Sequence, residues 1–153
     1  MNPTDVPIGA KFAIIHRAFR RELDAALREK DLTGAQFGVL RALDRLERER
    51  GGEISQRDIE ELSRSSHPTM TEILKKLEKK GFIAVSPSAV DGRRKAIRQT
   101  EKARELGREM FRIDEETFAK FSSALGAEEA ARIGGMLDCL LENICGQKEG
   151  EKR

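Results

Sequence analysis

The sequence predicts a mainly α-helical fold with one small β-hairpin. Apolar residues recur at spacings of three and four through most of the chain, which is the spacing of one helix face. A short β-prone run interrupts that spacing at residues 82–85, and capping residues precede the helical stretches. A length of 153 residues suits a single domain, residues 1–153, with an ordinary hydrophobic core.

Composition limits the class of protein. Hydrophobic residues make up 38% of the chain and charged residues 37%, yet the net charge is only +2, whereas disordered chains combine few apolar residues with a large net charge. No apolar run approaches the roughly 20 residues of a membrane span, and the first residues lack the pattern of a signal peptide. We therefore expect a cytoplasmic protein without a membrane partner, in which Cys139 and Cys145 stay reduced.

The first two helices are defined by one apolar stripe and one capping box. Apolar residues recur along one side of the first segment, so a helix is expected from about Pro7 to Glu29. Thr33 and Gln36 have the spacing of a capping box, in which each side chain bonds to the other residue's backbone amide. The second helix should begin there and stop at Gly51-Gly52.

Two shorter helices should follow in residues 55–80. Ser55 and Asp58 have the serine-to-acid spacing of a second capping box. A break at Ser63–Ser66 leads to the next helix, which Ser66 can cap and which tolerates Pro68 in its first turn. The apolar residues of this helix fall at i, i+3, i+4 and i+7, so one of its faces should be buried.

A hairpin and two further helices complete the predicted order. The run Phe82–Val85 and the segment Arg93–Arg98 can form two strands, separated by the turn signals of residues 86–92. Thr100 can cap a long helix, and a last helix follows Gly126.

Positive charge is concentrated in one segment. Residues 64–98 contain nine Lys/Arg and three Asp/Glu, a net charge of +6, which leaves −4 for the rest of the chain. A basic segment in an otherwise acidic protein indicates a polyanionic partner. A solvated, charged helix face is the alternative on charge alone.

Two helices joined by a tight turn and followed by a basic hairpin are the parts of a winged helix-turn-helix. The major groove of DNA is about 12 Å wide and admits one helix, which must bury one face in its own domain and present polar or cationic groups on the other. The helix from His67 to Lys80 meets both conditions, although an ordinary amphipathic surface helix would share them. The expected DNA-binding residues are Gln56, Ser65, Ser66, His67, Pro68, Thr69, Thr71, Lys75, Lys76, Arg93, Arg94 and Lys95.

Acidic residues in this basic segment need separate roles. Asp91 lies two residues before Arg93 and could hold that arginine in position in the wing, because a carboxylate facing phosphate would be repelled. Glu72 could accept a hydrogen bond from a cytosine amine or pair with Lys75 or Lys76 on its own helix. The basic wing could also be a charged edge strand that prevents aggregation.

The sequence resembles the MarR (multiple antibiotic resistance regulator) family over about residues 30–105. The resemblance is carried by five motifs, Ser55–Ile59, Pro68–Thr71, Leu77–Ile83, Asp91–Lys95 and Thr100–Lys102. It departs from the family pattern at Val85, Gly92 and Gln99. The resemblance implies a winged helix-turn-helix core at residues 33–100 (helix-turn-helix 55–80, wing 82–99), flanked by dimerisation helices at 7–30 and 101–146.

The resemblance also implies a triangular homodimer that reads a palindrome, and a small aromatic or phenolic effector. An effector pocket beside the first helix would involve Phe12, His16, Phe19 and Phe37, although a half-buried packing role is the favoured interpretation of His16. The apolar stripes of the end helices exceed what one thin layer could bury within a monomer. The expected dimerisation residues are Ile8, Ile15, Met110, Ile133, Leu137, Leu140, Leu141 and Ile144.

These features predict a sequence-specific transcription regulator, a repressor that binds a palindromic operator of double-stranded DNA as a homodimer and is released by a small-molecule effector. The alternatives are a non-specific architectural nucleic-acid-binding protein and a helical protein-interaction module. No catalytic constellation, metal site or cofactor motif is apparent, and His16 and His67 have no further ligands at metal spacing. An enzyme is therefore not expected.

Overall fold

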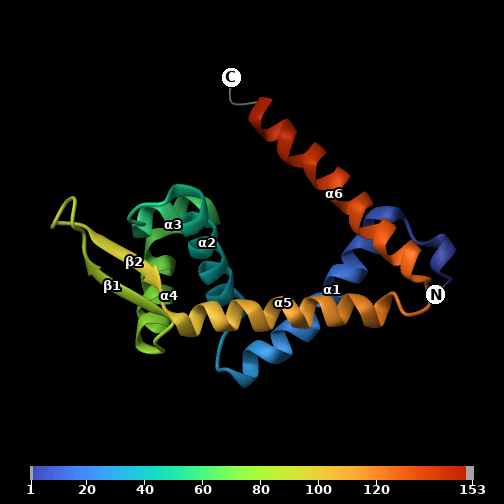
Figure 1. Ribbon diagram of the computed structural model, residues 1–153, viewed down its shortest axis with the longest axis horizontal. Helices are drawn as coiled ribbons and strands as arrows, with labels where there is room; N and C mark the ends of the chain where they lie inside the picture. Colours follow the sequence, from blue (N-terminus) through green and yellow to red (C-terminus); the bar gives the residue numbers. More distant parts are fainter. Residues whose placement is uncertain (1, 151–153) are drawn as a thin grey trace. The chain divides into compact units, whose positions relative to one another are not determined.

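The computed structural model describes residues 2–150, and the side chains of residues 2–144. It is mainly helical with one antiparallel hairpin, which confirms the predicted fold class (Figure 1). After a short 3-10 turn at Pro3–Asp5, the elements are α1 (Ile8–Glu29), α2 (Gly34–Arg50), α3 (Gln56–Ser63), α4 (His67–Lys79), β1 (Ile83–Pro87), β2 (Lys95–Gln99), α5 (Glu101–Phe121) and α6 (Ala127–Gly150).

The chain divides into two compact units, one ending at Asp114 and the other starting at Glu115. The division falls within α5, so the chain has two units joined by one continuous helix, whereas its length predicted a single domain. None of the helices in the described part of the chain is both long and apolar enough to cross a membrane.

Both predicted capping boxes are confirmed. At α2, the Thr33 hydroxyl accepts from the Gln36 amide (3.2 Å) and the Gln36 side chain accepts from the Thr33 amide (3.1 Å). At α3, Ser55 and Asp58 make the same reciprocal pair, and the Ser55 amide donates to the Asp58 carboxylate at 2.8 Å. These bonds satisfy amides that have no partner within the helix, so they fix where each helix begins.

Two other expected caps are wrong in their chemistry, although each residue lies directly before its helix. The Ser66 hydroxyl accepts no backbone amide and donates instead to the Thr69 hydroxyl at 2.9 Å. Pro68 has no amide hydrogen, which removes one of the two donors that such a cap uses. The Thr100 hydroxyl donates to the Gly81 carbonyl (2.7 Å), so it ties the start of α5 to the turn after α4.

The core of the first unit fixes the positions of α4 and of the β1–β2 hairpin. Met70, Leu74 and Leu77 are buried, which confirms the predicted apolar face of α4. Strand β1 pairs with β2 so that Val85 lies opposite Ile97. The Ile97 amide also donates to the Ile54 carbonyl at 2.8 Å, and this bridge attaches the hairpin to the segment before α3. The hairpin extends from there away from α3 and α4 (Figure 1).

The end helices expose apolar side chains. On α1 the exposed residues include Ile8, which is 71% exposed, and Ile15. On α6, Leu137, Leu140, Leu141 and Ile144 are exposed and Ile133 is half-buried. Cys139 lies on the same helix and is also exposed, whereas the side chain of Cys145 lies outside the described residues.

Met110 does not belong to this exposed set. Although it was expected at the dimer interface, its side chain is only 2% exposed and lies in the core of the first unit. The reason is that the first half of α5 packs the stripe Ala103, Leu106 and Met110 into that core. Met110 is therefore not available to a partner.

We predict that Asp58→Ala lowers the free energy of unfolding by about 1 kcal/mol, because it removes one half of the α3 capping box. Partial burial raises the pKa of Asp58, but hydrogen bonds from Ser55 and the ion pair with Arg50 outweigh it and hold the pKa below the ordinary value of 3.8. The stabilisation is therefore complete at neutral pH and disappears as the pH falls below 3.8. Denaturant melts of both proteins at several pH values measure this difference.

The control variant is Arg57→Ala on the same helix. Arg57 makes an exposed ion pair with Glu61, so its loss should change the unfolding free energy by less than about 0.5 kcal/mol. Equal effects of the two substitutions, or a difference for Asp58→Ala that persists unchanged at low pH, would contradict the role of the capping box.

Candidate nucleic-acid interface

The expected DNA-binding residues of the helix-turn-helix lie at the start of α3, in the turn between α3 and α4, and on the outer face of α4. Arg64 closes α3 in the left-handed conformation (φ 52°), and this permits the sharp turn into α4. Pro68 and Thr69 are exposed at the start of α4, and Lys75 and Lys76 are exposed further along it. The structure therefore brings these predicted residues to the accessible side of one helix.

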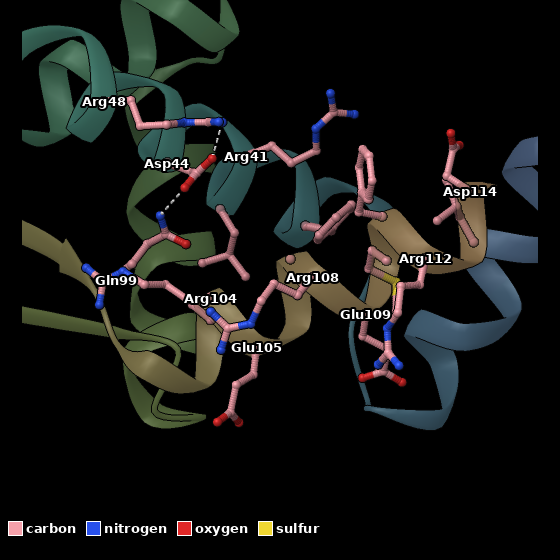
Figure 2. A pocket seen from close by; sticks show the side chains of 17 residues that line it. Arg41, Asp44, Arg48, Gln99, Arg104, Glu105, Arg108, Glu109, Arg112 and Asp114 are labelled. Carbon is pink, nitrogen blue, oxygen red and sulfur yellow. Dashed lines mark hydrogen bonds and ion pairs between the residues drawn. The ribbon is translucent and has the colours of Figure 1, made fainter. Parts of the chain in front are cut away.

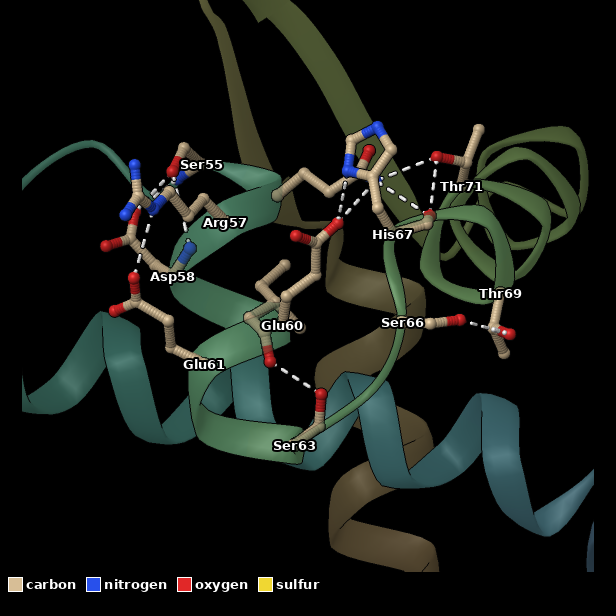
Figure 3. Close-up of polar contacts among 12 residues, drawn as sticks. Ser55, Arg57, Asp58, Glu60, Glu61, Ser63, Ser66, His67, Thr69 and Thr71 are labelled. Atoms are coloured by element: carbon tan, nitrogen blue, oxygen red, sulfur yellow. Dashed lines mark hydrogen bonds and ion pairs between the residues drawn. The ribbon is translucent and has the colours of Figure 1, made fainter.

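A polar network joins the starts of α3 and α4 (Figure 3). The Gln56 amide nitrogen donates to Glu60 Oε1 (2.7 Å) and to Thr71 Oγ1 (2.8 Å). The Thr71 hydroxyl donates to the His67 carbonyl at 2.9 Å, and His67 Nδ1 lies 2.7 Å from the same Glu60 oxygen. The network therefore connects Gln56, His67 and Thr71, and a carboxylate from α3 lies at its centre.

Glu60 was not among the predicted site residues. Its side chain is 16% exposed, whereas that of His67 is 74% exposed. The sequence offered one signal for it, because Gln56 and Glu60 are four residues apart and must share a face of α3. The contact with α4 depends on how the two helices pack, and nothing in the sequence spacing shows that packing.

Glu72 pairs with a cation of its own helix. Its carboxylate lies 3.5 Å from Lys75 Nζ, and both side chains are well exposed. Of the two roles considered for Glu72, the structure contains the pairing on α4. Lys76 makes no ion pair within the described residues, so its charge is available on this face.

The wing differs from the prediction in which arginine Asp91 holds. The Asp91 carboxylate lies 3.4 Å from Arg94 Nε, whereas it meets Arg93 only through the backbone amide (3.1 Å). The Arg94 amide donates to the Asp91 carbonyl (2.8 Å) and closes a tight turn. This turn brings its first and fourth residues together, so the expected positioning of the Arg93 side chain by Asp91 is wrong.

A second carboxylate anchors the wing loop, and no sequence pattern pointed to it. Glu53 accepts hydrogen bonds from the Ser88 hydroxyl and from the Ala89 amide (2.7 Å). The Ser88 hydroxyl in turn accepts from the Asp91 amide at 3.0 Å. The bonds from Ser88 and Ala89 hold the pKa of Glu53 below its ordinary value, so the carboxylate stays ionised and keeps both contacts at neutral pH.

A groove in the first unit lies between α2 and the first half of α5 (Figure 2). Its apolar lining includes Leu23, Phe37 and Leu40, and Arg41 and Arg108 are among its cations. Phe37 is thus the one expected pocket residue that lines it. Phe12 and His16 are exposed on α1, and Phe19 is not in the lining, because α1 packs on the core mainly through its C-terminal half, from Leu23 onward.

Gln99 occupies one end of this groove. It is buried, its amide side chain donates to Asp44 (3.3 Å), and its backbone amide donates to Glu47 at 2.8 Å. Asp44 also pairs with Arg48. The departure from the family pattern at Gln99 therefore has a structural role, since the glutamine links the end of the wing to α2.

The comparisons with known proteins agree with this arrangement. Residues 30–94 match the model of the MarR family. A single-residue variant of MepR from S. aureus, bound to an oligodeoxyribonucleotide, is similar with a TM-score of 0.70 and 25% identity, over 92% of this chain and 99% of that one. The reduced form of MarR from E. coli has a TM-score of 0.71 at 20% identity, over 89% and 97% of the two chains.

A further MarR structure has a TM-score of 0.74 at 23% identity, over 98% of each chain. The two MarR likenesses show the shared fold, and the family match covers the helix-turn-helix and the first part of the wing. Together with the exposed cations of α4 and the wing, they show that residues 30–94 are similar to the MarR family of DNA-binding transcription regulators and that the chain has the winged helix-turn-helix fold of MarR structures.

Proposed function

We propose that the chain is a homodimeric repressor that binds a palindromic operator and is released by a small-molecule effector. The observation that carries this proposal is the set of exposed cations on α4 and in the hairpin that follows it. Lys76 on α4 and Arg93 and Lys95 in the wing are exposed and make no ion pair within the described residues. Cations on a helix and on an adjoining wing are the groups that the DNA backbone requires.

The roles of the individual residues follow from their chemistry. The wing cations Arg93, Arg94 and Lys95 and the helix cation Lys76 would bind phosphates, which positions the protein without selecting a sequence. Thr69, at the exposed start of α4, would lie nearest the base edges. The core at residues 33–100 would make these contacts, and the segments 7–30 and 101–146 would make the dimer.

The partner that covers the end helices is a second copy of the chain. Ile8 and Ile15 on α1 and Leu137 and Leu140 on α6 are exposed. Apolar surface of this extent favours association, since burying each such side chain contributes roughly 1.5–3 kcal/mol. A two-fold dimer would present two recognition helices about 34 Å apart, one turn of DNA, and would therefore read a palindrome.

A small aromatic or phenolic effector would bind in the groove between α2 and α5. Phe37 and Leu40 supply apolar surface for a ring, and Arg41 and Arg108 supply cations for an acidic substituent. The groove also contains the side chain of Gln99, the last residue of β2, which donates a hydrogen bond to Asp44 of α2. A ligand there would therefore have a direct route to the wing.

The first prediction concerns DNA binding itself. At about 0.15 M salt, the protein should bind a palindrome from the DNA that flanks its own gene on the order of a thousandfold more tightly than random DNA. Arg93→Ala, Arg94→Ala and Lys95→Ala should each reduce the slope of log K against log salt by about one unit. Fluorescence anisotropy across a salt series measures both quantities.

Each negative outcome of that experiment has a distinct meaning. Equal affinity for the palindrome and for random DNA would indicate an architectural binder. Failure to retain any DNA at low salt would indicate a protein-interaction module. Asp114→Asn, a change of charge outside the proposed contact face, is the control that should leave the slope unchanged.

The second prediction concerns the wing anchor. Glu53→Ala should weaken operator binding about five- to tenfold, because it frees the wing loop from Ser88 and Ala89. Glu53→Gln should bind like the wild type, because its amide oxygen can still accept from Ala89. The sign of the effect is informative, since a carboxylate that merely repelled phosphate would give tighter binding on its removal. Anisotropy titrations at fixed salt, with circular dichroism to verify folding, decide between these results.

The third prediction concerns assembly. Leu137→Asp or Leu140→Asp should convert the dimer to a monomer and abolish operator binding, because an ionised carboxylate cannot be buried at an apolar interface. Asp138→Ala, an exposed neighbour on the same helix, should change neither property. Light scattering at low micromolar concentration measures the mass. A folded wild-type monomer that binds a half-site tightly would rule out this assembly.

A further inference from the structure

We propose that Glu60 is a positioning residue for sequence recognition. By fixing the Gln56 amide and the His67 ring, it leaves these side chains with hydrogen-bond acceptors for DNA, so that they select the amino group of an adenine or a cytosine. The inference rests on the proposed DNA-binding role of this face and names what the start of the recognition helix reads.

The orientation of the Gln56 amide follows from the atom that it faces. An ionised carboxylate can only accept hydrogen bonds, so the atom 2.7 Å from Glu60 Oε1 must be the nitrogen. The two hydrogens on this nitrogen go to its two shortest contacts, Glu60 and the Thr71 hydroxyl at 2.8 Å. The polar atom left to Gln56 is the carbonyl oxygen. This oxygen has no hydrogen-bond partner within the described residues. Because none of the buried side-chain nitrogen or oxygen atoms of those residues lacks a partner, the unpartnered oxygen must be accessible.

The tautomer of His67 follows in the same way. His67 Nδ1 lies 2.7 Å from the Glu60 carboxylate and must therefore carry a hydrogen. The Gln56 nitrogen is also 3.2 Å from Nδ1, but both of its hydrogens are used at shorter distances. A neutral His67 then has a bare Nε2, an acceptor, on the side of the ring away from Glu60 (Figure 3).

Thr71 adds no donor to this set. Its hydroxyl hydrogen goes to the His67 carbonyl at 2.9 Å, and its oxygen accepts from Gln56. The network therefore directs its hydrogens inward, toward Glu60 and the backbone of α4. Any replacement of Glu60 that cannot accept a hydrogen bond would release both the Gln56 amide and the His67 tautomer.

Outward-facing acceptors determine which part of DNA can bind. A phosphate oxygen and the O6 and N7 atoms of guanine are themselves acceptors, so they repel Gln56 Oε1 and neutral His67 Nε2. The matching donors in the major groove are the N6 amine of adenine and the N4 amine of cytosine.

The first test needs no DNA. Nitrogen-15 NMR of the free wild-type protein at about pH 8 should show neutral His67 with its hydrogen on Nδ1, and Glu60→Leu should lose this preference. Glu60→Gln should restore it, because the amide oxygen can accept in the same place. Observation of the Nε2–H tautomer in the wild type would overturn the inference whether or not the protein binds DNA.

The second test is selection of bound sites from a randomised DNA library. The wild type should prefer adenine or cytosine at one position of each half-site by on the order of fivefold. Glu60→Leu should lose the preference, Glu60→Gln should keep it, and His67→Phe should weaken it. A shared motif for the wild type and Glu60→Leu would refute the role of Glu60, whereas a wild type that selects no motif would refute the proposed function and this inference with it.

His67→Phe guards against a loss of folding in Glu60→Leu. The His67 side chain is 74% exposed, so its replacement should not alter the core, and circular dichroism verifies this. If Glu60→Leu fails to fold, the comparison of the sites selected by the wild type and by His67→Phe decides the matter. An identical motif with equal base preferences for these two proteins would overturn the inference.

Discussion

The burial of one face of α4 is the constraint on which the rest of the structure depends. Met70, Leu74 and Leu77 pack into the core, and this packing fixes the direction in which the opposite face points. A recognition helix must be held in this way, because its polar face is to meet DNA and cannot contribute to the core. The bridge between Ile54 and Ile97 extends the same core to the hairpin and so orients the wing relative to α4.

Carboxylates position the other groups of this basic face. Glu60 holds Gln56 and His67, Glu53 holds the wing loop, and Asp91 holds Arg94. Each of these carboxylates accepts hydrogen bonds from nearby protein groups. Those bonds partly neutralise a negative charge that would otherwise repel phosphate. These three carboxylates thus act as hydrogen-bond acceptors for groups of the protein itself, while cations of α4 and the wing remain exposed.

The helix order was predictable because its signals are local. A capping box needs only two residues three positions apart, so Thr33 with Gln36 and Ser55 with Asp58 could be identified from sequence. The apolar face of α4 could be identified from its spacing for the same reason. The cap at Ser66 was wrong because two hydroxyl groups bond to each other there, and spacing does not show which partner a hydroxyl takes.

The sequence by itself determined the elements, the basic segment and the two helices that form the helix-turn-helix, because these depend on neighbours within a few positions. Only the tertiary structure decided that Met110 is buried, that Phe12 and His16 lie apart from the groove at Phe37, and that Asp91 reaches Arg94. It also decided the partners of Glu53 and Glu60. Glu53 and Ser88 are 35 positions apart in the sequence, and Glu60 and His67 are seven apart. Contacts between separate elements depend on how those elements pack, which the sequence spacing does not show.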